Sequence, residues 1–416
     1  MSESPAPDTS MRALLRQGDF VLFWLSRWTA VLGVQIQSVA LGWHIYSIAR
    51  QTQDVKQSAF MVSLLGLVSF VPVLLLALPA GETADRYDRR RILKYTYAGE
   101  IIIASVLAIM TVTGHASIGL LLFSAALFGV SRAFFAPANT AMAPMLVPRE
   151  LLPRAIAWNS LAWQTASIAG PAIGGILVAI SPSLSYGVAA GLYIVAALTI
   201  LLIRSNTQPQ VQPGSRWALM KEGLAYVWNN KIVFGAISLD LAAVILAGAT
   251  AMLPVYAKDV LHVGPEGFGL LRAAPAIGAA AMAFYLAAAA IRRRAGAIMF
   301  VSVAIFAIGT VVFGLSKVMW LSVAALVVLG AADMISVYIR QTLIQLATPD
   351  HMRGRVATVS SLFIGASNEL GEFRGGVVAR FIGPVAAVVW GGVGALVVTA
   401  AWAKLFPDLR KADRLA

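Results

Sequence analysis

Apolar runs long enough to cross a lipid bilayer recur along the chain and limit its fold more than any other feature. A hydrocarbon core roughly 30 Å thick needs about 20 mostly apolar residues in a helix. Only 12% of the 416 residues are charged, against roughly a quarter in soluble domains. Periodicity and breakers predict spans over 20–48, 58–83, 92–113, 117–143, 156–179, 184–203, 231–255, 267–290, 296–314, 319–346, 354–380 and 383–405. We therefore predict an all-α membrane protein with twelve transmembrane helices.

The Lys and Arg residues indicate the direction of the spans. Of 32, the N-terminus, every second connection and the C-terminal tail hold 22, and the alternate connections hold five. Because positive connections stay in the cytoplasm, both termini are predicted to be cytoplasmic. The net charge of +13 is then explained by topology, and no nucleic-acid surface is expected.

A polar stretch divides the spans six and six. We expect an N-terminal lead over 1–19, a bundle over 20–205, a cytoplasmic linker over 206–230, a second bundle over 231–406 and a tail over 407–416. Within the linker, WALMKEGLAYVW after a Ser215 N-cap predicts an amphipathic surface helix. The halves are related, since GPAIGG at 170–175 matches GEFRGG at 371–376. Such six-helix repeats occur in one large class of transporters.

The sequence lacks two features: cysteine residues and a signal peptide at its start. The chain has no cysteine, which excludes disulfides and thiolate metal sites, and no metal site is predicted. Its first twenty residues lack the apolar region and cleavage site of a signal peptide.

The connection between the second and third spans reads GETADRYDRR, in the form G-x-x-x-D-R-x-x-R-R. With twelve spans and the six-plus-six repeat, it resembles the major facilitator superfamily. Two further stretches, around 132–160 and 348–384, resemble the branch with the enterobactin exporter and macrolide efflux proteins, also described as transmembrane secretion effectors.

The resemblance implies a rocker-switch exporter of a small organic molecule, siderophore-like or drug-like, driven by proton antiport. Spans 1, 4, 7 and 10 would line its central cavity. Gly170, Pro171, Gly174 and Gly175 match the end of an antiporter motif in span 5, although upstream glycines are replaced by Ala157 and Ala166. The resemblance further implies a bacterial inner membrane location, contact with lipids, a monomer, and no cofactor besides the proton gradient.

The charged connection GETADRYDRR has two interpretations. Its arginines could simply fix orientation or touch anionic headgroups. Alternatively, Asp85 could pair with the start of span 11 near Arg353 and Arg355, and so act as a cytoplasmic gate. The residues predicted for this loop site are Gly81, Asp85, Arg86, Arg89 and Arg90.

Charges inside the spans are costly, about 2.5–3.5 kcal/mol near the bilayer centre, so each needs a partner, a wet cavity or a function. The predicted cavity spans hold Arg27, Arg132, Asp240, Asp333 and Arg340. They could form structural ion pairs, such as Arg27–Asp240 or Arg132–Asp333. Alternatively, Asp240 or Asp333 could carry the coupled proton.

Other polar residues receive weaker predictions. Glu369 and Glu372 of span 11 share a helix face and could form a second proton site, while the adjacent glycines would allow close packing. Glu100 is expected to hydrogen-bond between helices. Trp43, Phe135 and Tyr338 are candidate substrate contacts, although such rings more often pack.

Other function classes are less well supported by the sequence. No phosphate loop of an ATP-driven pump and no H-E-x-x-H or G-x-S-x-G motif occurs, so no enzyme is expected. An importer or uniporter, and a receptor or scaffold that does not transport, stay open as alternatives.

Overall fold

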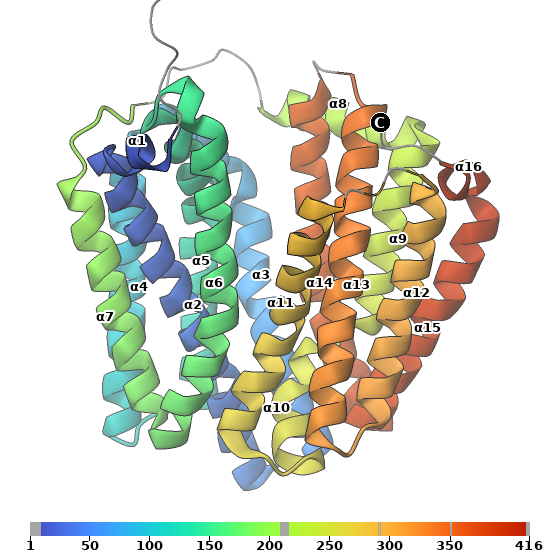
Figure 1. Cartoon of the computed structure of the whole chain (residues 1–416). Helices are drawn as coiled ribbons and strands as arrows, with labels where there is room; N and C mark the ends of the chain where they lie inside the picture. Colours follow the sequence, from blue (N-terminus) through green and yellow to red (C-terminus); the bar gives the residue numbers. More distant parts are fainter. Residues whose placement is uncertain (1–9, 209–215, 290, 292, 350–351, 413–416) are drawn as a thin grey trace, which may run out of the picture. The chain divides into compact units, whose positions relative to one another are not determined.

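The computed structural model describes residues 10–208, 216–289, 291, 293–349 and 352–412. Every regular element in these ranges is helical (Figure 1). Ser215 lies outside the described residues, so its capping role is not assessed.

A helix occupies each of the twelve predicted ranges. The first six are α2 (Gly18–Thr52), α3 (Val55–Arg86), α4 (Arg89–Val112), α5 (Ile118–Met142), α6 (Leu152–Ile180) and α7 (Pro182–Leu202). The last six are α9 (Lys231–Ala247), α11 (Gly264–Ala288), α12 (Ala295–Leu315), α13 (Met319–Ala347), α14 (Arg353–Ile382) and α15 (Pro384–Leu405). Among the described residues, ten segments are both long and apolar enough to cross a membrane, and the one that begins with α9 continues to Val260. The other two, α2 and α14, contain 35 and 30 residues and carry the charges discussed below.

The short elements lie near the two ends of the chain, in the connections between the long helices and in the segment that follows α9. They are α1 (Met11–Leu15), η1 (Ala143–Met145), η2 (Arg149–Leu151), α8 (Arg216–Asn229), η3 (Thr250–Met252), α10 (Leu253–Val255), the π-helix η4 (Tyr256–Val260) and α16 (Pro407–Arg410). The predicted helix in the linker is confirmed as α8.

The span predicted over 231–255 lies within Lys231–Val260, a segment long and apolar enough to cross a membrane, but its helix is interrupted. The α-helix stops at Ala247, and η3, α10 and η4 continue the segment. A Cβ at Gly248 would lie 3.0 Å from the carbonyl carbon of Gly371 in α14. Close backbone approach at this glycine, followed by Pro254, accounts for the break.

The chain forms two compact units. The first contains 1–40 and 71–213, and the second contains 41–70 and 214–416. The end of α2 and the start of α3 therefore group with the second unit, and the domain division predicted from the sequence stays a prediction.

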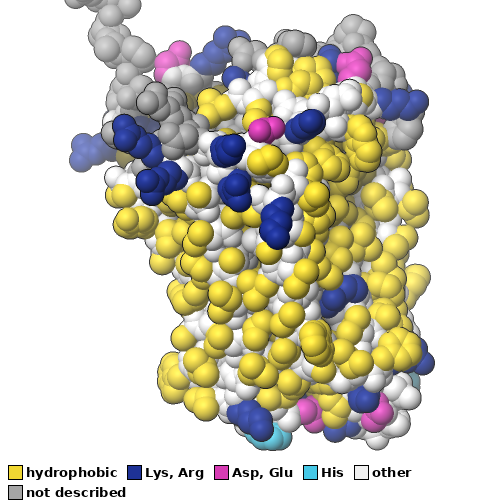
Figure 2. All heavy atoms as spheres, turned by 90° about the vertical axis from the view of Figure 1, so that its right-hand side faces the viewer, with side chains coloured by type: hydrophobic (Ala, Val, Ile, Leu, Met, Phe, Trp, Pro, Cys, Tyr) yellow, Lys and Arg dark blue, Asp and Glu magenta, His cyan; other side chains and the backbone are white. Residues whose placement is uncertain are grey.

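Each unit buries its own apolar core. In the first, α4 packs on α5 and α7 around Phe23, Tyr97 and Met142. In the second, α13 packs on α11 and α12, and α15 on α12 and α9. Figure 2 shows a broad hydrophobic surface over the second unit, with Lys and Arg gathered near one end. An apolar outer face of this kind suits a lipid environment.

Candidate functional site

An ion pair joins two helices inside the second unit. Asp240 comes from α9, and Arg340 comes from α13. A guanidinium nitrogen of Arg340 contacts Oδ1 of Asp240, and the Arg340 side chain is only 2% exposed. An arginine this deeply buried needs a partner of opposite charge. The pairing of Asp240 with Arg340 was not among the pairs considered from the sequence.

Asp333 lies in the same neighbourhood, two turns before Arg340 on α13. A small cavity of about 10 Å³ is lined by Asp240 and Asp333 together with Ser336, Phe306, Val303, Val244 and Ala243. This volume is about what one water molecule requires. Two carboxylates and a hydroxyl around a water-sized space form an arrangement in which a proton can be held and passed on.

The first unit has a different charge cluster, built on α2, α4 and α5. The Ser131 hydroxyl is 3.3 Å from Oε1 of Glu100 and 3.1 Å from the backbone oxygen of Thr96. Glu100 is 2% exposed, and Arg132 acts on it electrostatically. The interhelical hydrogen bond predicted for Glu100 is therefore confirmed.

Arg27 lies beside this cluster and interacts electrostatically with Tyr97 of α4. Its Nε is buried without a hydrogen-bond partner in the described structure. The predicted pairs Arg27–Asp240 and Arg132–Asp333 would join the two units, and they stay predictions.

Glu369 and Glu372 of α14 both face α3. A Cβ on Gly66 would lie 3.1 Å from Oε2 of Glu369 and 3.4 Å from Oε2 of Glu372. The structure therefore brings the two carboxylates together at one glycine, as their shared helix face predicted. A role for them in proton coupling stays a prediction.

The glycines of α6 and α14 allow close helix crossings. A Cβ at Gly174 would lie 3.1 Å from the Cβ of Val39, and one at Gly170 would overlap Gln35, both residues of α2. In α14, Gly371 meets the backbone of Val244 in α9 in the same way. Gly170, Pro171, Gly174 and Gly175 are all buried. The close packing predicted for the α14 glycines is confirmed at Gly371, and Gly170 and Gly174 of α6 pack closely as well. A role of the α6 motif in antiport stays a prediction.

The charged connection is tied to other helices of its own unit. Arg89 donates to the backbone oxygen of Ala141 at 2.9 Å, and Arg90 donates to that of Leu201 at 3.0 Å. Asp88 caps α4 by accepting from the Arg90 backbone nitrogen at 3.0 Å. Arginines at the C-terminal ends of α5 and α7 stabilise these helices, because the last backbone carbonyl oxygens there carry partial negative charge.

The remaining loop residues have less defined roles. Gly81 is buried, Asp85 is half-buried and Arg86 is exposed, and Asp85 acts electrostatically on Arg89. The sequence did not indicate the contacts of Arg89 and Arg90 with carbonyl oxygens. The gate stays a prediction.

The three candidate aromatic contacts all pack against protein. Trp43 stacks on Phe268 with ring centroids 5.9 Å apart, and the Lys258 ammonium lies 5.8 Å from the Trp43 ring. Phe135 contacts Tyr97 at 5.9 Å, and Tyr338 packs on the core of the second unit. Their role as substrate contacts stays a prediction.

No metal site is evident in the part of the chain that the structure describes. No group of three or more His, Asp or Glu side chains there could hold a metal ion.

Comparison with known proteins places the chain in a family. Residues 9–416 match the family described as transmembrane secretion effector. The chain belongs to that family. The predicted recognition, a major facilitator transporter of the secretion effector branch, is confirmed.

Curated relatives of this secretion effector chain include two proteins named enterobactin exporter EntS. The one from Citrobacter koseri is 27% identical over 411 residues, covering 94% of this chain and 92% of the relative. The one from Escherichia coli O6:K15:H31 is 27% identical over 408 residues, with the same coverage of both chains.

Solved structures share the fold. A bacterial homologue of the human lysosomal transporter Spinster, inward-facing and unoccupied, has a TM-score of 0.70 at 16% identity, covering 96% of this chain and 98% of that one. The POT family transporter PepTSo has a TM-score of 0.75 at 10% identity, covering 95% and 99%. At these identities the likeness shows the fold alone. The family match, the exporter relatives and the apolar helices together show a multi-pass membrane protein of a transporter family.

Proposed function

We propose that the protein is a secondary active transporter that exports a small organic molecule, siderophore-like or drug-like, by proton antiport. It would work as a monomer in the bacterial inner membrane, cross that membrane twelve times and keep both termini in the cytoplasm. Curated relatives named enterobactin exporter support export of a small organic molecule of that kind.

The observation that carries the proposal is the Asp240–Arg340 ion pair beside the water-sized cavity that Asp333 also lines. Asp240 contacts Arg340 directly, and Asp333 interacts with the same arginine electrostatically. Protonation of Asp240 or Asp333 would remove one negative charge and weaken the electrostatic attraction between the acids and Arg340. The arginine would then be available to an anionic group, and deprotonation would restore the pair.

Asp240 and Asp333 are the groups we assign to the proton, and Arg340 is the group whose pairing the proton controls. Arg27 and Arg132 of the first unit would provide positive charge for an anionic substrate. The chemistry uses a proton gradient and no bound cofactor.

Inside-out vesicles with an imposed pH gradient test both direction and coupling. We expect wild-type vesicles to accumulate at least one compound from a panel of catechol siderophores, macrolides and cationic dyes. Accumulation only in right-side-out vesicles would indicate an importer. Absence of any substrate-dependent proton flux would favour a receptor or scaffold.

Asp333→Asn and Asp240→Asn separate coupling from binding. Each should reduce gradient-driven accumulation at least tenfold, because an amide cannot take up the proton. Exchange of labelled for unlabelled substrate without a gradient should persist in at least one variant. Asp408→Asn, at an exposed residue of α16, is the matched control. Full coupling in both intramembrane variants would remove these acids from the mechanism.

A further inference from the structure

The linker helix α8 is held firmly against the second unit. The Tyr226 hydroxyl donates to the backbone oxygen of Ala347 at the end of α13. Glu222 forms an ion pair with Arg355 at the start of α14. A Cβ on Gly223 would lie 2.9 Å from the Arg355 backbone oxygen, so the two backbones nearly touch. These contacts fix α8 in place without using its remaining face.

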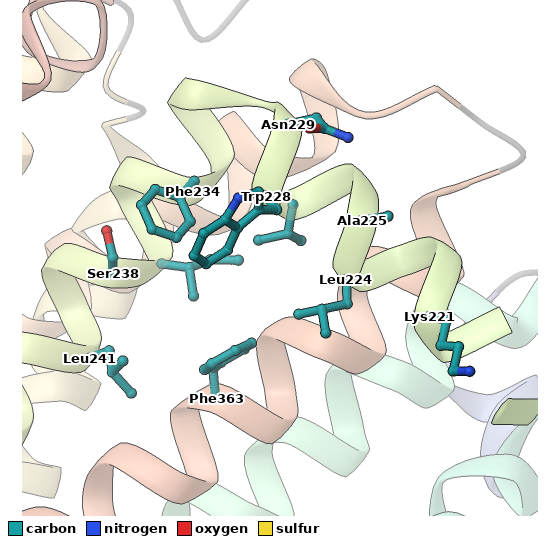
Figure 3. Close-up of a pocket in the computed structure, with 11 residues that line it drawn as sticks. Lys221, Leu224, Ala225, Trp228, Asn229, Phe234, Ser238, Leu241 and Phe363 are labelled. Carbon is teal, nitrogen blue, oxygen red and sulfur yellow. The ribbon is translucent and has the colours of Figure 1, made fainter. Parts of the chain in front are cut away.

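That remaining face of α8 borders a groove, which also involves α9 and α14. The groove has a volume of about 680 Å³, within the range of small-molecule sites. Leu224 and Trp228 are 45% and 71% exposed there, although the helix carrying them is docked. Figure 3 shows these two side chains facing Phe363 of α14 and Phe234 of α9 around the open space.

The polar groups of the groove are few and unevenly placed. Lys221, Asn229 and Ser238 are the polar residues among those that line it. Ser238 accepts a hydrogen bond from the Trp402 indole at 3.0 Å. In Figure 3, Lys221 lies at one side of the open space and Leu241 at the other, with Leu224 and Phe363 between them. A cation at one end and a long apolar wall match a ligand with an anionic head and a hydrocarbon tail.

We propose that this groove binds one acyl chain of an anionic phospholipid, with the headgroup at Lys221. Exposed Lys231 is the first residue of α9, two positions after Asn229, which lines the groove. Basic residues next to membrane helices attract anionic lipids, and exposed Trp is typical of the membrane interface. A polar substrate would find few hydrogen-bonding groups here. The lipid would fill the space between α8, α9 and α14, so that the linker helix and these two helices form one packed unit.

Quenching of Trp228 by brominated lipid tests the proposal on the full-length protein in mixed micelles. Phosphatidylglycerol and phosphatidylcholine, each with brominated acyl chains, are titrated separately, and the contribution of Trp228 is obtained by subtracting the Trp228→Phe variant. We expect half-maximal quenching at a mole fraction at least fivefold lower for phosphatidylglycerol. Coincident curves for the two lipids in the wild type would overturn the proposal.

Two variants divide the site into its charged and apolar parts. In Lys221→Gln, the quenching curves for phosphatidylglycerol and phosphatidylcholine should coincide. In Leu224→Glu, quenching by both lipids should be at least fivefold weaker. Leu405→Glu, at a 67% exposed position at the end of α15, should leave the preference unchanged. Gel filtration and circular dichroism verify folding. If siderophores or macrolides abolish the quenching, the groove is a substrate site and the lipid proposal is wrong.

Discussion

Both units bury ionisable side chains, but they satisfy them in different ways. In the first unit, Glu100 accepts from a neighbouring serine and lies near Arg132. In the second, Arg340 is paired directly with Asp240, and Asp333 shares a water-sized cavity with that pair. With Arg27 beside it, the first arrangement holds two arginines for one acid, and the second holds two acids for one arginine. The carboxylate pair to which we assign the coupled proton, Asp240 and Asp333, belongs to the second unit.

The same comparison shows how closely the helices correspond. Gly170 of α6 crosses α2 at Gln35, and Gly371 of α14 crosses α9 at Val244. Four residues later in each helix, a Cβ on Gly174 would contact Val39, and a Cβ on Gly375 would contact the backbone of Gly248. In each half the first and fifth helices cross at a glycine of the matching stretches GPAIGG and GEFRGG. The backbone is thus reused while the charges differ, as expected where the scaffold is shared and the site is specialised.

Removal of the buried cation should have the largest effect on stability. Arg340→Met leaves Asp240 without the charge that compensates it, and breaking a buried pair typically costs about 3–5 kcal/mol. Thermal unfolding in detergent should therefore show a clear decrease in Tm. The double variant Asp240→Asn/Arg340→Met should recover part of the loss, because the Asp240 carboxylate is no longer left without its cation. A single variant as stable as the wild type would mean that the pair is not a buried one.

The glycine crossings give the next largest effect and test whether the halves respond alike. Gly170→Ala and Gly371→Ala force a methyl group into neighbouring backbone or side chain, and overpacking typically costs about 1–3 kcal/mol. Gly191→Ala and Gly365→Ala are matched controls, since nothing lies within 4 Å of a Cβ at either position. Thermal unfolding should separate the two sets. Similar losses at Gly170 and Gly371 would support equivalent crossings, and a loss in one half alone would contradict them.

The sequence predicted the helices well because the membrane imposes a strong length and polarity rule. Predicted 156–179 became α6 at Leu152–Ile180, and predicted 319–346 became α13 at Met319–Ala347. The break after Ala247 was missed, because it depends on the backbone of α14, which a local pattern does not contain.

The charged residues were found from the sequence, but most of their partners were not. Periodicity indicates which face of a helix a residue occupies, and it does not say which residue of another helix faces it. The pairing of Arg340 with Asp240, and the contacts of Arg89 and Arg90 with carbonyl oxygens, follow from helix packing. Asp333 and Arg340 lie seven positions apart on α13, about two helical turns, so their spacing alone places them on one face of that helix.

The smallest expected effect is in the first unit and sharpens the contrast with the second. Glu100→Gln keeps an oxygen for the Ser131 hydroxyl and removes only the charge. A hydrogen bond between membrane helices is worth about 0.6 kcal/mol on average, so the Tm should change little. Gradient-driven transport should stay within about twofold of wild type, because in our proposal the coupled proton belongs to Asp240 and Asp333. Loss of coupling with preserved substrate exchange in Glu100→Gln would move the proton site to the first unit and reverse the assignment of the two charge clusters.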